Sequence, residues 1–298
     1  MKVTKLCQKM LACLLAALLA LLYPEQPEYL TDVQELIWAI CEECSWVLPA
    51  HCENTLESAE GTIDLFSAET AFTLAEIDYM LGERLDANIR QQLRRQVERR
   101  ILKNLETHTY FWETATHNWS AVCAGNAGGA LLYLFPEAFE KMLPRFIGAM
   151  ENLMKGFPED GTCTEGFSYW HYGFGFFISY AQMLRIFTEG KEDYFKRPKV
   201  HSIATFIQKM YLSGNSSVSF ADAGSKLEYH IGMLHFLANE YDDVTVYSPE
   251  FSYINDNCAR ICWQISAAVW LDENLYFNPA PNEDEKEYYA EKSAWLVK

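Results

Sequence analysis

Helical periodicity runs through nearly the whole sequence and limits its fold more than any other feature. Apolar residues recur at the three- and four-residue spacing that places them on one face of a helix. Strand patterns are few and short, the clearest being 218–220 and 244–247. We therefore predict an all-α fold, with helices over 11–22, 33–46, 63–81, 86–105, 118–135, 136–155, 168–188, 200–212, 227–239 and 256–270.

The turns between these helices are short, so successive helices can pair as hairpins that stack side by side. Roughly nine or ten helices can curve into an open or closed α/α toroid, although periodicity alone also fits an irregular bundle. We expect one helical domain over residues 1–275. Residues 276–298 contain a proline-bearing linker, a charged run and an apolar stretch at 294–297. They are expected to be a linker and the first strand of a further, interrupted domain.

The charge balance excludes one class of partner. The chain has 298 residues, and 41 acidic against 24 basic side chains give a formal net charge of −17. A nucleic-acid-binding protein needs basic surface to neutralise phosphates, so no nucleic-acid partner is expected. The longest uncharged apolar run, Leu11 to Leu22, is shorter than the roughly 20 residues that span a bilayer. We therefore expect no membrane partner.

Two features bear on the cellular compartment. Lysines precede the run Leu11–Leu22 as in a signal peptide, which would make the protein secreted, but no clear cleavage site follows it. Nine scattered cysteines do not match a disulfide framework and favour a reducing cytoplasm. Cys41, Cys44, His51 and Cys52 could form a zinc cluster. Since buried thiols are common in helices, we expect neither a metal site nor another cofactor.

Two segments combine polar, aromatic and small residues in a way that plain core helices do not. Trp46 and His51 flank Pro49 at a helix exit, where Trp46 could stack on a sugar ring and His51 could hydrogen-bond to it. A loop packed over the core explains the same residues. Asn118 is a natural N-cap, and its amide could instead face a ligand carboxylate at the positive end of the helix dipole.

A third segment, 160–173, is a glycine-containing turn that leads into an aromatic helix. Tyr169 and Tyr172 lie three residues apart and share a helix face. A tyrosine can transfer protons if nearby positive charge lowers its pKa from about 10. An aromatic core stripe that continues through Phe174 and Phe176 is the competing interpretation, and both stay open for the two tyrosines.

Other polar groups leave further alternatives. The carboxylate pairs Asp64 with Glu69 and Asp160 with Glu165 would suit a glycoside hydrolase. One helix face is densely basic, and it is either a local anion site or a solvated face paired with nearby acids. This basic row comprises Arg90, Arg94, Arg95, Arg99 and Arg100.

Four motifs occur in order along the chain: W-x-L-P-x-H from Trp46, D-L-F-x-A-E-T from Asp64, N-W-x-A-V-C-x-G from Asn118 and D-G-x-C-x-E-G-x-x-Y-W-x-Y-G from Asp160. Each motif alone is weak, but the ordered set resembles the heparinase II/III-like family, in its uncharacterised bacterial branch. The resemblance extends from about Leu11 to Trp270.

The resemblance implies an incomplete α/α toroid, followed by a β-sandwich domain that would begin where this sequence ends. It implies a polysaccharide lyase that cleaves an acidic, uronate-containing glycan by β-elimination. Asn118 would neutralise the uronate carboxylate, and Tyr169 or Tyr172 would act as base and acid. The residues that would line the cleft are Trp46, His51, Glu69, Trp119, Glu165 and His171.

Two further functions remain as alternatives: a non-catalytic carbohydrate-binding or scaffold module, and an α/α-toroid glycoside hydrolase. Relatives complete their active site with the β-sandwich, so activity of the helical domain alone is not implied. If the lyase assignment holds, the Asn118 amide and a tyrosine hydroxyl must reach one sugar ring, within roughly 10 Å of each other. They should open onto one cleft, with Trp46, His51 and Trp119 on its walls.

Overall fold

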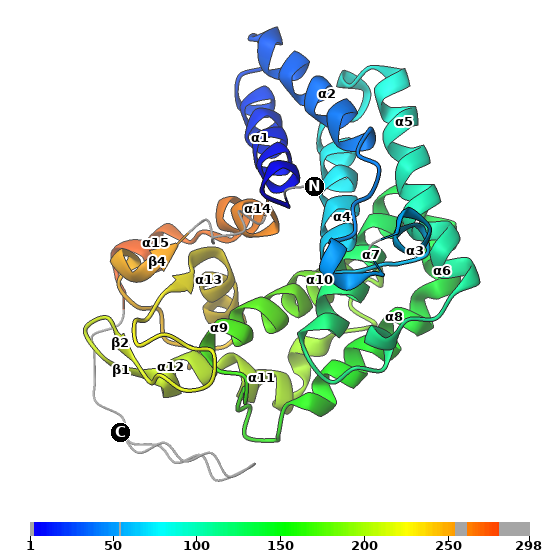
Figure 1. Cartoon of the computed structure of the whole chain (residues 1–298). Helices are drawn as coiled ribbons and strands as arrows, with labels where there is room; N and C mark the ends of the chain where they lie inside the picture. Colours follow the sequence, from blue (N-terminus) through cyan, green and yellow to red (C-terminus); the bar gives the residue numbers. More distant parts are fainter. Residues whose placement is uncertain (1–2, 54, 254–260, 280–298) are drawn as a thin grey trace. The chain divides into compact units, whose positions relative to one another are not determined.

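The computed structural model of the chain describes residues 3–53, 55–253 and 261–279. These residues are mostly helical, and their strands form only two-stranded pairs, as the all-α prediction requires (Figure 1). They divide into two compact units where the sequence predicts one domain over 1–275. The first unit consists mainly of 3–115 and 119–150, and the second of 116–118, 151–253 and 262–279.

The first unit is built from packed helices, shown from blue to green in Figure 1. Helix α1 packs against α2 and α4, and α5 packs against α2 and α4. Elements labelled η are 3₁₀ turns, except for the π-helical turns η3 and η5. The elements in chain order are α1 Val3–Leu22, α2 Pro27–Cys41, η1 Pro49–His51, α3 Leu56–Glu60, α4 Leu65–Leu81, η2 Gly82–Arg84, α5 Ala87–Val97, η3 Glu98–Leu102, α6 Lys103–Thr107, η4 Phe111–Glu113, α7 Asn118–Leu134 and α8 Pro136–Gly156.

Two helix starts differ from the prediction. Helix α1 already begins at Val3, because the residues before Leu11 include good helix formers such as lysine and glutamine. Helix α2 begins at Pro27 rather than at residue 33. Proline is tolerated in the first turn, where its missing N–H needs no partner. Pro27 therefore starts the helix that it was expected to precede.

Helix α4 begins at a capping box and is largely buried in the first unit. The Asp64 carboxylate accepts a hydrogen bond from the Ser67 N–H at 2.8 Å, and the Ser67 hydroxyl accepts one from the Asp64 N–H at 3.0 Å. Most residues of α4 are buried. The capping box thus explains why the helix predicted over 63–81 starts at Leu65.

The expected helix over 86–105 is interrupted by η3, and the one over 168–188 by η5. A π-helical turn inserts one residue into a helix and is frequent at functional sites. No residue type encodes it, so the sequence predicts a continuous helix in both places. Each of these turns contributes residues to a pocket of its own unit.

The second unit has shorter helices and two small pairs of strands. Strands β1 and β2 pair antiparallel, whereas β3 and β4 pair parallel. Its elements after α8 are α9 Phe167–Tyr169, η5 Trp170–Phe174, α10 Gly175–Phe187, η6 Tyr194–Lys196, α11 Pro198–Ala204, α12 Phe206–Met210, β1 Tyr211–Ser213, β2 Ser216–Ser217, β3 Tyr229–His230, α13 Ile231–Glu240, η7 Pro249–Phe251, β4 Ser252–Tyr253, α14 Ile261–Trp270 and α15 Glu273–Phe277.

Both strand predictions are wrong, since 218–220 and 244–247 are irregular. Their backbone groups bond outside a ladder: the Val218 N–H donates to the Met210 carbonyl, and the Thr245 N–H donates to the Gln208 side chain. Alternating apolar side chains, buried at Val244 and Val246 and half-buried at Val218 and Phe220, gave these segments a strand-like pattern. The expected strand at 294–297 and the predicted helix start at 256–260 lie outside the described residues.

Aromatic side chains fill the core of the second unit. Phe174, Phe177 and Tyr180 are fully buried, so the aromatic stripe predicted as core is confirmed for these later residues. The turn before α9 needs two glycines. Gly161 and Gly166 have φ values of 81° and 93°, and a Cβ on either would collide with backbone oxygen. None of the described helices has the length and apolarity to span a membrane.

Candidate functional site

A pocket of about 270 Å³ in the second unit draws its lining from two of the segments that the sequence singles out. Asn118 begins α7, Glu165 lies in the turn before α9, and Tyr169 ends α9; all three line the pocket. The residues come from 116–118, 153–157 and 163–173. We refer to it as the Asn118 pocket.

Asn118 contributes an unsatisfied polar group to this pocket. Its side chain is buried, with 7% of the residue exposed, and its Oδ1 atom accepts no hydrogen bond. The helix start predicted at Asn118 is confirmed, but this oxygen does not cap the helix. A buried carbonyl without a partner costs about 1–3 kcal/mol. Such a group in a pocket is therefore a candidate ligand contact.

The close approach of η5 to Asn118 depends on Gly173. A Cβ atom on Gly173 would lie 3.2 Å from the Cβ of Asn118. Tyr169 precedes Gly173 by four residues, about one helical turn, and lines the same pocket. The structure thus brings Asn118 and Tyr169 to one cavity, as the lyase prediction requires of an Asn and a Tyr.

The end of α8 also approaches the pocket closely. A Cβ atom on Gly156 would lie 1.8 Å from the Thr116 carbonyl oxygen, which is far too close. Only glycine allows the segment 116–118 to lie against this helix end. The position of Asn118 is therefore fixed from two sides, by Gly156 and by Gly173.

Tyr169 and Glu165 differ in their surroundings. Tyr169 is half-buried, and its hydroxyl has no hydrogen bond to a described residue. Glu165 is exposed, and its main-chain carbonyl accepts a 3.4 Å hydrogen bond from the Asp222 N–H. A phenol and a carboxylate thus remain available to a ligand in the Asn118 pocket.

Tyr172 and His171 lie elsewhere in the second unit. Tyr172 is half-buried and packs edge-on against Phe176, with ring centroids 5.5 Å apart. It is not part of the pocket lining. His171 was expected to line a cleft, but it is 5% exposed and packs against Phe167 and Trp170. Burial lowers the pKa of His171 to about 3, so it is a neutral core residue.

The remaining predicted residues belong to the first unit. Trp46 is 1% exposed, its indole donates a 2.9 Å hydrogen bond to the Ile40 carbonyl, and the Arg100 guanidinium covers its ring. Its faces are therefore closed to a sugar, and the prediction that Trp46 stacks on one is wrong. The interpretation of this segment as a loop packed over the core is the better one.

His51 forms a dyad with a buried carboxylate. Its Nδ1 atom lies 2.8 Å from Oδ2 of Asp64, which is fully buried and also accepts the Leu48 N–H at 3.0 Å. The ring of His51 packs against Trp119 with ring centroids 4.8 Å apart, and both rings are half-buried.

Glu69, the last of the predicted cleft residues, is half-buried on α4. The predicted residues thus divide between the units, with Trp46, His51, Glu69 and Trp119 in the first.

Sequence reasoning missed one titratable residue of the Asn118 pocket. His117 is exposed and lines it. Its position directly before Asn118 was the available indication, but the direction of a side chain before a helix start cannot be read from the sequence.

The other proposed chemistries find less support. Among the described residues, no three potential ligands lie close enough to hold a metal ion. Asp64 serves as a helix cap, and Asp160 accepts two hydrogen bonds from Thr162. Glu165 is the single carboxylate in the lining of the Asn118 pocket. The pocket therefore lacks the carboxylate pair of a glycoside hydrolase.

Comparison with known proteins adds no family assignment. No protein-family model matches the chain, and no curated protein matches it.

Proposed function

We propose that the chain is a heparinase II/III-like domain, an incomplete α/α toroid, that cleaves an acidic glycan by β-elimination in the Asn118 pocket. One observation carries the proposal: the buried, unpaired side-chain oxygen of Asn118 belongs to the same pocket as Tyr169. The ordered motifs that resemble the family include both residues.

The proposed chemistry assigns one role to each group. A uronate carboxylate binds at Asn118, whose amide can turn to present its NH₂ group as donor. This contact and the positive end of α7 stabilise the charge that develops when the C5 proton leaves. Tyr169, as phenolate, accepts that proton. The C5–H electrons form the 4,5-double bond, the C4–O bond breaks, and Tyr169 returns the proton to the leaving oxygen.

The pocket suits a local contact with an anion better than long-range attraction. Its lining contains Glu165 and His117 but neither lysine nor arginine. The whole chain carries a net charge of −17. We therefore expect that added salt does not raise the KM for a uronate glycan, because the pocket has no lysine or arginine to screen and salt also screens the repulsion by the negative chain.

The test is an assay for unsaturated product. The chain is incubated with a panel of uronate-containing glycans, and ultraviolet absorbance reports the new double bond. We expect Asn118→Ala and Tyr169→Phe to reduce kcat by at least about 100-fold, as loss of a proton-transfer group does. Tyr172→Phe, outside the pocket, is the matched control and should retain activity. Absence of both product and glycan binding would refute the proposal, as would a turnover left unchanged by Asn118→Ala and Tyr169→Phe.

A non-catalytic carbohydrate-binding module is the second candidate. The lack of lysine and arginine in the pocket lining favours it, since no such cation is present to stabilise the charge that develops during β-elimination. This candidate predicts saturable glycan binding without product. It further predicts that binding survives Tyr169→Phe, whereas the lyase proposal predicts product from the unmodified protein.

A further inference from the structure

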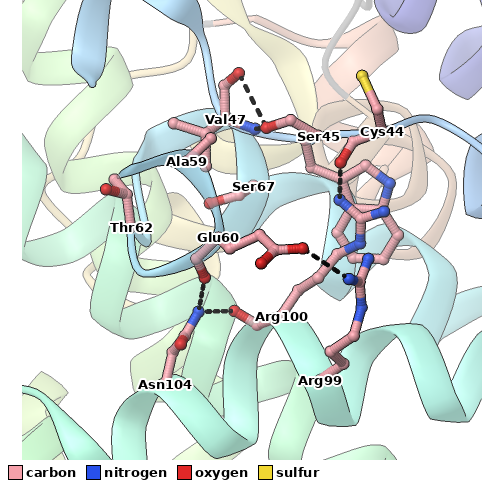
Figure 2. Close-up of a pocket in the computed structure, with 11 residues that line it drawn as sticks. Cys44, Ser45, Val47, Ala59, Glu60, Thr62, Ser67, Arg99, Arg100 and Asn104 are labelled. Carbon is pink, nitrogen blue, oxygen red and sulfur yellow. Dashed lines mark hydrogen bonds and ion pairs between the residues drawn. The ribbon is translucent and has the colours of Figure 1, made fainter. Parts of the chain in front are cut away.

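A second pocket, in the first unit, contains two successive arginines. It has a volume of about 190 Å³, and Arg99 and Arg100 of η3 lie on one side of it (Figure 2). Ser45 follows the end of α2, and Glu60 ends α3; both also line the pocket. We refer to it as the arginine pocket.

Arg100 is held rigidly by groups that do not neutralise it. Its Nε donates to the Gln96 side chain at 3.1 Å, its Nη1 to the Cys44 carbonyl at 3.5 Å and its Nη2 to the Glu43 carbonyl at 2.6 Å. The guanidinium lies 4.6 Å from the ring centroid of Trp46. No carboxylate of the described residues forms an ion pair with it. Burial and the neighbouring Arg99 lower the pKa of Arg100 to about 10, whereas the nearby Glu60 carboxylate acts in the opposite direction. Arg100 therefore carries a positive charge without a directly bound carboxylate.

Arg99 is available to a ligand because its ion pair is exposed to solvent. Its Nη1 donates to the Glu60 carboxylate at 3.1 Å, as the dashed line in Figure 2 shows. Both side chains are open to solvent, at 48% and 65% exposure. Exposed ion pairs of this kind contribute little. A ligand that offers Arg99 a better acceptor can therefore displace Glu60.

The other arginines of the basic row are occupied or point elsewhere. Arg90 and Arg94 both bind the buried carboxylate of Asp78, at 2.7 and 2.6 Å. Arg95 is exposed and lies outside the pocket. Successive residues of an α-helix point about 100° apart, and the π turn η3 lets Arg99 and Arg100 line one cavity. The row is thus largely a paired helix face, with further positive charge at η3.

We propose that the arginine pocket binds a small oxyanion, of the phosphate or sulfate class, between Arg99 and Arg100. Guanidinium groups match oxyanions with paired hydrogen bonds, and a pre-positioned guanidinium loses little freedom on binding. The Ser45 hydroxyl, whose one donated bond is 3.5 Å long, can turn to donate to the anion. The proposal is independent of the lyase function, because the Asn118 pocket shares no residue with it.

The experiment is calorimetric titration of the full chain with inorganic phosphate and with sulfate, at constant ionic strength in chloride. We expect saturable binding at one site. Arg99→Gln should weaken it about tenfold, since the lost charged hydrogen bond is partly exposed. Glu60→Gln should tighten it, because the competing carboxylate is gone. Arg95→Gln makes the same charge change outside the pocket and should leave the Kd unchanged.

Arg100→Lys probes the buried guanidinium, since it keeps the charge but loses the planar fork, and it should weaken binding more than Arg99→Gln. If that variant does not fold, Arg99→Gln and Glu60→Gln still test the proposal, because Arg99 and Glu60 are solvent-exposed and their replacement should not prevent folding. No saturable binding of either anion would overturn the proposal. So would an equal loss in Arg95→Gln, or weaker binding in Glu60→Gln.

Discussion

Two buried histidines should make the second unit sensitive to mild acid. Burial lowers the pKa of His171 to about 3 and that of His230 to about 4. His230 is 1% exposed, and its Nδ1 accepts the Met233 N–H at the start of α13. Protonation would both charge a buried ring and remove this cap. Folding thus requires both rings to stay neutral.

The sign and size of the effect follow from proton linkage. The unfolded chain has histidine pKa values of about 6.5, so below that pH it binds more protons than the folded unit does. Stability therefore falls as the pH drops from about 6.5 towards 4. One pKa unit corresponds to about 1.4 kcal/mol. At pH 5 each histidine costs about 2 kcal/mol, and the pair about 4 kcal/mol.

The assay is urea unfolding between pH 7 and 4.5, with hydrogen exchange of α10 amides to report on the second unit. His171→Phe should reduce the pH slope by about 1.4 kcal/mol per unit. His108→Gln, an exposed histidine of the first unit, is the control and should leave the slope unchanged. Stability of the second unit that stays constant from pH 6.5 to 5 would refute this reasoning, as would an unchanged slope in His171→Phe.

Two further predictions concern stability. Gly156→Ala should lower the free energy of unfolding by about 3 kcal/mol or more, because the new methyl group clashes with Thr116. Gly148→Ala on the same helix meets open space and should be neutral or stabilising by up to about 1 kcal/mol. Thermal unfolding compares the two variants, and equal shifts of their unfolding temperatures would contradict the clash. Asp64→Ala should lower the free energy of unfolding by about 2–4 kcal/mol, since it removes the α4 cap and the partner of His51. A midpoint of urea unfolding within error of that of the unmodified protein would contradict this prediction.

Helices that begin at local signals could be predicted well from the sequence. Pro136 starts α8 as expected, because proline preferences act within one turn. Asn118 starts α7 as expected, although its side-chain oxygen makes no cap. Helix α2 was misplaced because Pro27 can either break a helix or begin one. The choice depends on which residues the first turn packs against.

Burial could not be predicted for single residues of the candidate site. Trp46 and Asn118 both stand in segments whose composition fits a pocket or a packed loop. Arg100, distant in sequence, covers Trp46 and closes its ring, whereas glycines at 156 and 173 leave Asn118 beside a cavity. Such outcomes depend on long-range packing, which helical periodicity does not encode.

The two π turns make each pocket sensitive to chain length. A π turn contains one residue more than the α-helix around it, so a single-codon deletion would restore a regular helix. The residues on one side of the deletion would then rotate by about 100° relative to those on the other. In η3 this would turn Arg99 and Arg100 together relative to the preceding helix α5, and in η5 it would turn Gly173 away from Asn118. Each pocket could thus be gained or lost in one genetic step, with the helix itself preserved.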